Sequence, residues 1–278
     1  MLECILDSLI DTIKLIPYLL VTFIILEYLE HKLSKKNEKM LKKNKKYGPI
    51  IGALLGALPQ CGFSTMAASL FSSKVITIGT LIAVFLATSD EMLPIMISEK
   101  IPIIEIIYII SFKVIIGIII GLLIDTMIKY KGNSKDIHHL CEKEHCDCDS
   151  DGILISSIKH TLKIAIFILI ANIGISLLIN WVGEENLENL LLRNNPITYF
   201  IASLIGLIPN CASSVIMTEL YISKFISLGT LLSGLLTGSG LGILILFRTN
   251  EDLKENMKIL GIIYTVGVII GFLTDIII

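Results

Sequence analysis

The sequence predicts an all-α integral membrane protein made of two inverted repeats, each with a re-entrant broken helix. The first observation is composition: 54% of the 278 residues are hydrophobic and 17% are charged, whereas soluble domains carry roughly 25% charged residues. The second is a duplication, because residues 52–125 align with residues 202–275 without a gap and match at 23 of 74 positions. The third is a proline at the same place in both halves, which predicts the broken helices.

Eight hydrophobic segments are long enough to enter a membrane, since a spanning helix needs about 20 apolar residues. They cover residues 8–30, 48–72, 75–98, 101–129, 155–182, 196–222, 225–247 and 257–278. Four segments fall in each half of the chain. We therefore expect a first membrane repeat at 1–130, a polar loop at 131–154 and a second membrane repeat at 155–278.

The charges of two equivalent loops indicate how the halves are oriented. Residues 31–47, after the first segment, contain eight lysines, which predicts a cytoplasmic loop. The equivalent loop after the fifth segment carries Glu184, Glu185 and Glu188, with Arg193 as its cation. Opposite charge bias predicts opposite sides of the membrane, and hence inverted rather than parallel halves. The loops at 31–47, 130–154 and 248–256 would then be cytoplasmic, and both termini would lie outside.

Prolines near the middle of the second and sixth segments favour re-entrant hairpins. Pro59 and Pro209 leave about 11 residues on either side, too few for either half to cross a membrane. Two half-helices that meet at a tip fit these lengths. The alternative is a complete span that is kinked at the proline.

The breaks themselves carry the first candidate binding residues. Proline frees nearby backbone carbonyls, and such groups are tolerated at membrane depth only inside protein or in a watery cavity. We therefore expect a substrate site where the two tips meet, and the alternative is close helix packing with cysteine as a small apolar residue. The residues concerned are Pro59, Gln60, Cys61 and Ser64, and their counterparts Pro209, Asn210, Cys211 and Ser214.

A second polar break lies in the third segment and has a counterpart in the seventh. Ser89 is followed by Asp90 and Glu91, whereas Ser239 is followed by Gly240 and Leu241. An ionisable residue inside a membrane is a functional candidate by default, so one carboxylate is expected to bind a cation or carry a proton. The alternative is that both carboxylates lie near the outer surface and contact water.

The loop between the halves has the composition of a metal-binding segment. Three thiols and three imidazoles within 11 residues suit Zn²⁺ or a similar cation, and the irregular spacing favours a flexible capture segment. The candidate ligands are His138, His139, Cys141, His145, Cys146 and Cys148. The alternative is a solvated linker with this composition by coincidence.

These motifs resemble those of the ten-helix heavy-metal exporter family, whose members are labelled manganese transporters or arsenic efflux permeases. The resemblance rests on Pro-Gln-Cys and Pro-Asn-Cys, the Ser-Lys and Gly-Thr-Leu that follow in each half, and the loop rich in His and Cys. It covers essentially the whole chain. It implies a multi-pass plasma-membrane permease that exports a metal or metalloid.

We therefore expect a secondary exporter of a heavy-metal cation or arsenic species, since the chain has no P-loop pattern for driving transport with ATP. We do not expect an enzyme. The alternatives are an inorganic-anion exporter that uses Lys74 and Lys224, and a membrane metal sensor that does not transport. The expected partners are the metal or metalloid ion and the lipid bilayer, without nucleic acid. No cofactor is expected to be required, although a divalent metal could bind the central loop, and the sequence leaves the oligomeric state open.

Overall fold

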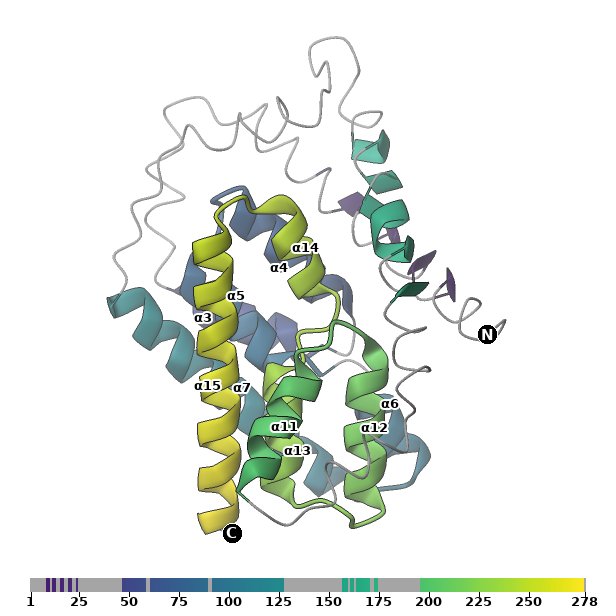
Figure 1. Ribbon diagram of the computed structural model, residues 1–278, viewed down its shortest axis with the longest axis vertical. Coiled ribbons are helices and arrows are strands. Elements are labelled where there is room, and N and C mark those ends of the chain that lie inside the picture. The colour runs from purple at the N-terminus through teal and green to yellow at the C-terminus, as the bar shows by residue number, and fades with distance from the viewer. Residues whose placement is uncertain are drawn as a thin grey trace.

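A computed structural model of the chain describes the two membrane repeats in most of their length. The described residues are 9–10, 12–13, 16–17, 20–21, 24, 47–58, 61–89, 92–127, 157–159, 161–162, 164–170, 173–174 and 196–277. Within them all regular structure is helical, without a strand (Figure 1). Four segments are long and apolar enough to cross a membrane: Ile78–Ser98, Ile103–Met127, Leu228–Thr249 and Leu253–Ile277. The prediction of an all-α membrane protein is confirmed.

The internal repeat of the sequence is also a repeat of helices. The first half contains α3 (Gly48–Gly56), α4 (Cys61–Ser72), α5 (Ile78–Ala87), α6 (Met92–Ser98) and α7 (Ile103–Met127). The second half contains α11 (Ile197–Gly206), α12 (Cys211–Ile222), α13 (Leu228–Thr237), α14 (Gly242–Thr249) and α15 (Leu253–Ile277). The bounds of α4, α5 and α7 recur 150 residues later in α12, α13 and α15.

Caps conserved between the halves fix where α5 and α13 begin. Thr77 accepts a hydrogen bond from the Thr80 N–H in the first half, and Ser227 accepts one from Thr230 in the second. A carboxylate from the end of the long helix completes each cap, because Asp125 Oδ1 accepts from the Gly79 N–H at 2.9 Å. Negative charge is favourable at a helix N-terminus. In each half these residues therefore join the start of the broken span to the end of the long continuous helix that follows it.

The first short helix of each half is part of a helical hairpin. A Cβ on Gly48 would meet Thr80, and one on Gly56 would meet Val84, so α3 lies beside α5 and runs in the same direction. The chain must then return through α4 before α5 begins at Ile78. This path fits a re-entrant segment better than a single kinked span. In the second half, Gly206 likewise packs on Gly234 of α13.

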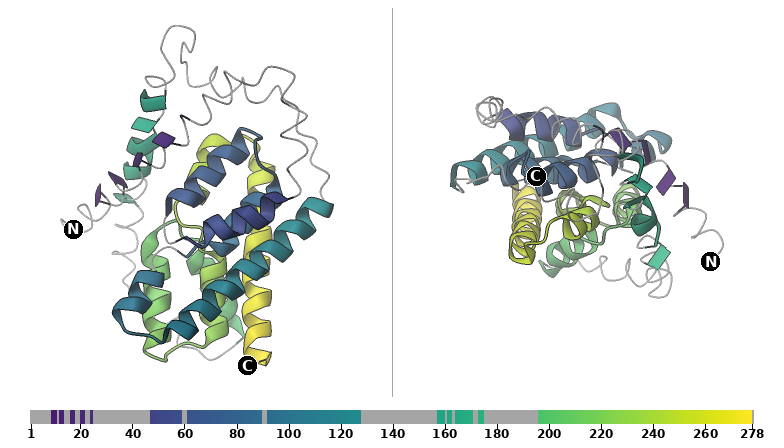
Figure 2. Two further views of the ribbon diagram at one scale, coloured as in Figure 1. Left: turned by 180° about the vertical axis from the view of Figure 1, so that it is seen from behind. Right: turned by 90° about the horizontal axis from the view of Figure 1, so that it is seen from above.

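The two halves interlock through their broken helices. The α4 helix lies along α14 in the same direction, because Ser64 contacts Gly242 at one end and Ser72 Oγ lies 2.6 Å from Thr249 Oγ1 at the other. In the same way α12 packs against α6, and Figure 2 shows α4 and α14 side by side from behind. The interior of the molecule is therefore built from helices of both halves.

The broken spans are inside and the continuous helices are outside. Ile78–Ser98 is 75% buried and Leu228–Thr249 is 83% buried, whereas Ile103–Met127 is 28% buried and Leu253–Ile277 is 33% buried. The outer helices expose large apolar side chains such as Ile104, Ile115 and Phe272. Such surfaces suit contact with lipid.

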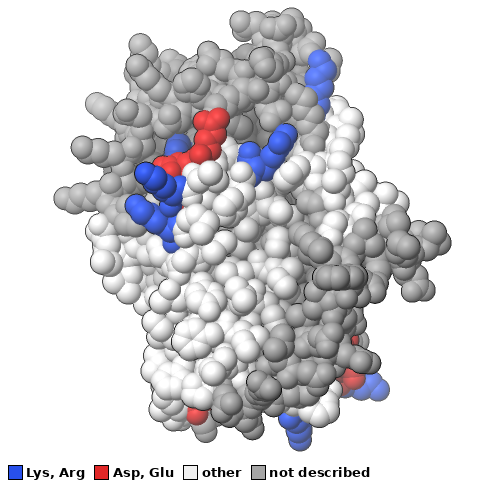
Figure 3. Space-filling view, viewed as in Figure 1, with Lys and Arg blue, Asp and Glu red and all other residues white. Residues whose placement is uncertain are grey.

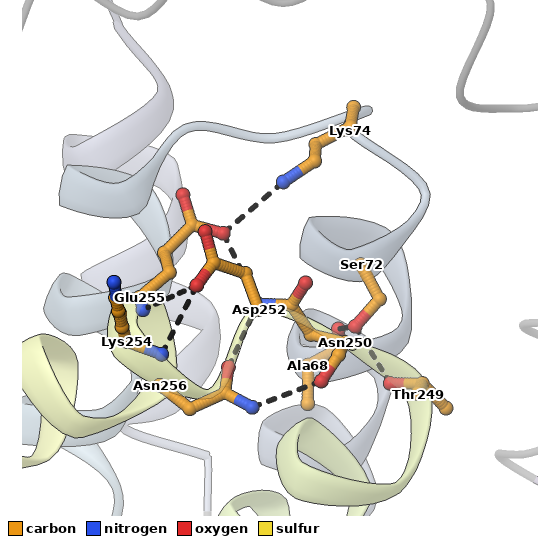
Figure 4. A network of polar contacts seen from close by, with 9 residues as sticks. All are labelled: Ala68, Ser72, Lys74, Thr249, Asn250, Asp252, Lys254, Glu255 and Asn256. Atoms are coloured by element: carbon orange, nitrogen blue, oxygen red, sulfur yellow. Dashed lines mark hydrogen bonds and ion pairs between the residues drawn. The ribbon is translucent and has the colours of Figure 1, made fainter.

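Charged side chains collect at the two ends of the molecule. Figure 3 shows Lys, Arg, Asp and Glu at the top and bottom of the described surface, with an uncharged band between them. At one end Lys74 pairs with Glu255 at 3.1 Å, in the polar network drawn in Figure 4. The same end holds the start of α3, the end of α7 and the connection from α14 to α15, because Asp125 caps α5 there. These positions flank the three loops that the sequence predicts to be cytoplasmic.

Candidate functional site

Four helix breaks come together in the interior. They lie between α3 and α4, α5 and α6, α11 and α12, and α13 and α14. A Cβ on Gly242, at the start of α14, would lie 2.9 Å from Ser64 Cβ in α4 and 2.8 Å from the Phe85 ring in α5. The breaks of the two halves are therefore neighbours. Such breaks expose free backbone groups, which are tolerated at membrane depth only inside protein or beside a cavity.

The serines predicted for this site are interior residues. Ser64 and Ser239 are fully buried, Ser89 is 1% exposed, and Ser214 is partly buried. The Ser89 hydroxyl donates to the Ala87 carbonyl at 3.1 Å. Ser64 and Ser214 lie in the first turns of α4 and α12.

The cap of α12 is made by the residue before it. Asn210 Oδ1 accepts a hydrogen bond from the Ala212 N–H at 3.0 Å, and Asn210 has extended backbone angles. Asparagine is one of the residues that helix N-termini prefer at this position. Pro209 lies in the turn before it. Asn210 thus satisfies a free N–H of α12.

Several predicted ligands lie outside the described residues. These are Pro59, Gln60, Asp90 and Glu91, together with the loop ligands His138, His139, Cys141, His145, Cys146 and Cys148; Cys61 and Cys211 are described in their backbone but not in their side chains. Among the described residues there is no group of three or more His, Cys, Asp or Glu side chains that could hold a metal. The thiol and carboxylate roles remain predictions.

A buried lysine was not singled out from the sequence. Lys113 is in the middle of α7 and is 0% exposed. Its ammonium donates a hydrogen bond to the carbonyl oxygen of Thr88, the residue that caps the C-terminus of α5. A cation is favoured at the C-terminal end of a helix. The signal that could have found it is an ionisable residue ten positions inside a long apolar segment.

Hydroxyl side chains form a second unexpected feature, on α4 and on the residue that directly follows it. Thr65, Ser69, Ser72 and Ser73 are all buried, and each donates to a backbone carbonyl three or four residues earlier. Small hydroxyl residues allow close packing between membrane helices. They make the surface between α4 and its neighbours polar.

The duplicated lysines lie away from the four breaks. Lys74 follows α4 and pairs with Glu255, and Lys224 follows α12 and is exposed. Both have positive φ, 58° and 61°, in the turn that ends the helix. They occupy opposite ends of the protein, because α4 and α12 run toward different ends. An anion site built on both lysines together is not supported by this placement.

The comparison with known families is decisive for the class of protein. The family described as "Putative, 10TM heavy-metal exporter" matches residues 1–184 and 153–278. The chain belongs to this family. The resemblance inferred from the Pro-Gln-Cys and Pro-Asn-Cys motifs is therefore confirmed over the whole chain. No curated protein and no solved structure matches it.

Membership of the heavy-metal exporter family agrees with the fold. The apolar outer surfaces of α7 and α15 place the protein in a membrane. The family indicates a transporter of metal ions, which is consistent with a protein that is not an enzyme. The interior breaks bring backbone groups and buried hydroxyls of both halves close together.

Proposed function

We propose that this chain is a secondary exporter that moves a heavy-metal cation or an arsenic species across the plasma membrane. The observation that carries the proposal is the contact between Ser64 of α4 and Gly242 of α14, which brings a helix break of one half against a helix break of the other. Transporters built from repeats bind their substrates at such interfaces between discontinuous helices. The family supports the class of substrate.

The first part of the proposed substrate site is formed by the two proline-containing breaks. Cys61 and Cys211 would offer thiolates, which are soft ligands that select thiophilic ions. Gln60, Asn210, Ser64 and Ser214 would offer oxygen ligands and hydrogen-bond donors. The proposal is supported by the positions of α4 and α12, which both begin at these cysteines and run away from the centre.

The second part of the proposed site is formed by the breaks after α5 and α13. Ser89 and Ser239 are buried there, and Asp90 and Glu91 follow Ser89 in the chain. We assign one of these carboxylates to the transported cation or the coupling proton. The Lys113 ammonium at Thr88 supports a role for charge at this break.

We also propose that the halves are inverted in the membrane. Two relations support this orientation. The α4 helix runs opposite to the hairpin partner α3 but in the same direction as α14. The α13 and α14 helices together run antiparallel to α15, since Gly229 faces Gly271 and Asn250 bonds to Asn256. It follows that α5 and α13 point in opposite directions, and that the end near the lysine-rich loop is cytoplasmic.

The loop at 131–154 would collect metal on the cytoplasmic side. Its thiols and imidazoles are dense enough to provide four ligands to Zn²⁺ or a similar ion. It lies outside the duplicated units, so we assign it capture rather than transport. Bound metal in this loop would not be a cofactor that transport requires.

The test is transport by purified protein in proteoliposomes, with Mn²⁺, Zn²⁺, Cd²⁺, arsenite and phosphate offered separately. Export of a metal or of arsenite is expected, and Cys61→Ser or Cys211→Ser should slow a soft substrate far more than a hard one. Cys4→Ser is the matched control, because Cys4 lies outside the aligned repeats. Transport of phosphate alone would favour the anion exporter, and no transport of any ion would favour a sensor.

A further inference from the structure

Backbone oxygens gather around one glycine in the connection after α13. A Cβ placed on Gly238 would lie 3.3 Å from the Gly234 carbonyl oxygen, and 3.7 Å from those of Gly206 and Leu235. Gly206 ends α11 and Leu235 is in the last turn of α13. The last carbonyls of a helix have no intrahelical partner, and they form the negative end of its dipole. Two helix C-termini therefore meet beside Gly238.

A buried hydroxyl lies next to this group of oxygens. Ser239 is 0% exposed, and its Oγ has no hydrogen-bond partner among the residues that the structure describes. Its N–H donates to the Thr237 carbonyl at 3.0 Å, which leaves the Leu235 carbonyl without this donor. Buried polar groups in native proteins are nearly always paired. An unpaired buried hydroxyl in the residue after Gly238 therefore indicates a bound ligand that oxygen atoms can coordinate, such as a cation.

The equivalent position in the first half is filled by the protein itself. Thr88 corresponds to Gly238, and its hydroxyl donates to the Val84 carbonyl at 2.8 Å. The Lys113 ammonium donates to the Thr88 carbonyl, and the Ser89 hydroxyl donates to Ala87. In this half a side-chain cation occupies the carbonyl end of α5.

The second half lacks the threonine hydroxyl and the lysine ammonium at the same place. Glycine replaces Thr88, and the fully buried Ile263 replaces Lys113. Gly240 and Leu241 replace Asp90 and Glu91. The carbonyl end of α13 thus keeps its oxygens, but its counterpart residues bring neither a cation nor a carboxylate.

We propose that the carbonyl end of α13 beside Gly238 binds a monovalent alkali cation, with Na⁺ taking the role that the Lys113 ammonium has at the carbonyl end of α5. The Gly206 and Leu235 carbonyls and the Ser239 hydroxyl are the ligands. Neutral oxygen dipoles suit a single charge, whereas divalent Ca²⁺ and Mg²⁺ sites rely on carboxylates. The bound ion would be the coupling ion of the exporter; that role rests on the proposed function, but the binding does not.

The experiment measures the thermal unfolding of the purified full-length protein in detergent without substrate. NaCl, KCl and LiCl are compared with choline chloride at constant ionic strength. A ligand that binds only the folded state raises the unfolding temperature and does so saturably. We expect this rise with Na⁺ or another alkali ion in the natural protein.

Two variants locate the ion. Gly238→Thr installs the residue of the first half and places a side chain among the carbonyl oxygens. It should therefore abolish the rise in unfolding temperature. Gly261→Thr is its matched control, because a Cβ at Gly261 meets nothing within 4 Å; it should keep the rise. Ser239→Ala removes one ligand with little change of shape and should weaken the apparent ion affinity about tenfold.

Three results would overturn the inference. One is an unfolding temperature of the natural protein that is the same in every salt. Another is an undiminished rise in Gly238→Thr. If the Gly238→Thr variant does not fold, the third is an apparent ion affinity of Ser239→Ala that equals that of the natural protein. Ion binding without transport of any panel ion would instead refute the proposed function alone, and transport without ion binding would refute this inference alone.

Discussion

Lys74 Nζ lies 3.1 Å from Glu255 Oε2 and so joins the turn after α4 in the first half to the first turn of α15 in the second. Asn250 Nδ2 donates to the same oxygen at 3.1 Å and to Asn256 Oδ1 at 2.7 Å (Figure 4). The ammonium also lies 5.2 Å from the centroid of the Phe71 ring. The contact between the halves at this end is a supported network rather than an isolated surface pair.

Loss of either partner of this ion pair should weaken the protein modestly. The two side chains are 21% and 19% exposed, so we expect Lys74→Met and Glu255→Gln each to lower stability, with a coupling energy of about 1 kcal/mol. A double-mutant cycle from thermal unfolding in detergent measures it. Lys224→Met, at the exposed counterpart of Lys74, should change stability less. Additive effects of the two substitutions would mean that the pair contributes nothing.

Removal of the buried ammonium should impair transport more than folding. Lys113→Met puts an apolar side chain of similar length in place of the lysine and leaves the Thr88 carbonyl without its cation. We therefore expect the transport rate in proteoliposomes to fall at least tenfold. Ile263→Met changes the equivalent buried position without removing charge, and volume-conserving swaps cost less than about 1.5 kcal/mol. It should transport normally. A Lys113→Met protein with an unchanged rate would make Lys113 a structural residue.

The two equivalent loops should face opposite sides of the membrane. Cysteines placed at Asn37 and Asn186, in a background without native cysteines, should react with a membrane-impermeant thiol reagent from different sides. A cysteine at Ser134 serves as the control and should react from the same side as Asn37. Labelling of Asn37 and Asn186 from one side would refute the inverted arrangement.

The central loop should bind metal without forming part of the transport path. Replacement of Cys141, Cys146 and Cys148 by serine removes the soft ligands, so it should reduce the stoichiometry of Zn²⁺ bound to the full-length protein. The maximal transport rate should change less than about twofold, since substitutions outside the core usually have small effects on stability. Equilibrium dialysis and proteoliposome flux measure the two quantities. Complete loss of flux in a correctly inserted triple variant would place the loop in the path.

Local features of this fold were readable from the sequence because their causes are local. The duplicated Gly-Thr-Leu marks the starts of α5 and α13, where Thr77 and Ser227 supply the caps. The breaks near Pro59 and Pro209 follow from the chemistry of proline. The family resemblance depended on the same duplicated motifs and was confirmed over the chain.

The partners of the broken helices could not be read in this way. The repeat alignment pairs Ser64 with Ser214, but Ser64 packs against Gly242, a contact that only the folded interior determines. The role of Lys113 could not be predicted from the duplication, because its counterpart is Ile263 and a duplication marks residues that both halves share. The exchange of Thr88 for Gly238 does not by itself predict a binding site, because the carbonyl oxygens around Gly238 come from two helices that only the fold brings together.

The pairing of α4 with α14 has a consequence for biosynthesis. The buried hydroxyls of Thr65, Ser69 and Ser72 lie on a helix whose partner in the second half is made much later, at residues 242–249. Until the ribosome has delivered that segment, α4 can pack only on helices of its own half, such as α5, and the first half cannot reach its final packing by itself. Membrane insertion of the early segments and completion of the interior are thus separate events, and the second must wait until nearly the whole chain has been synthesised.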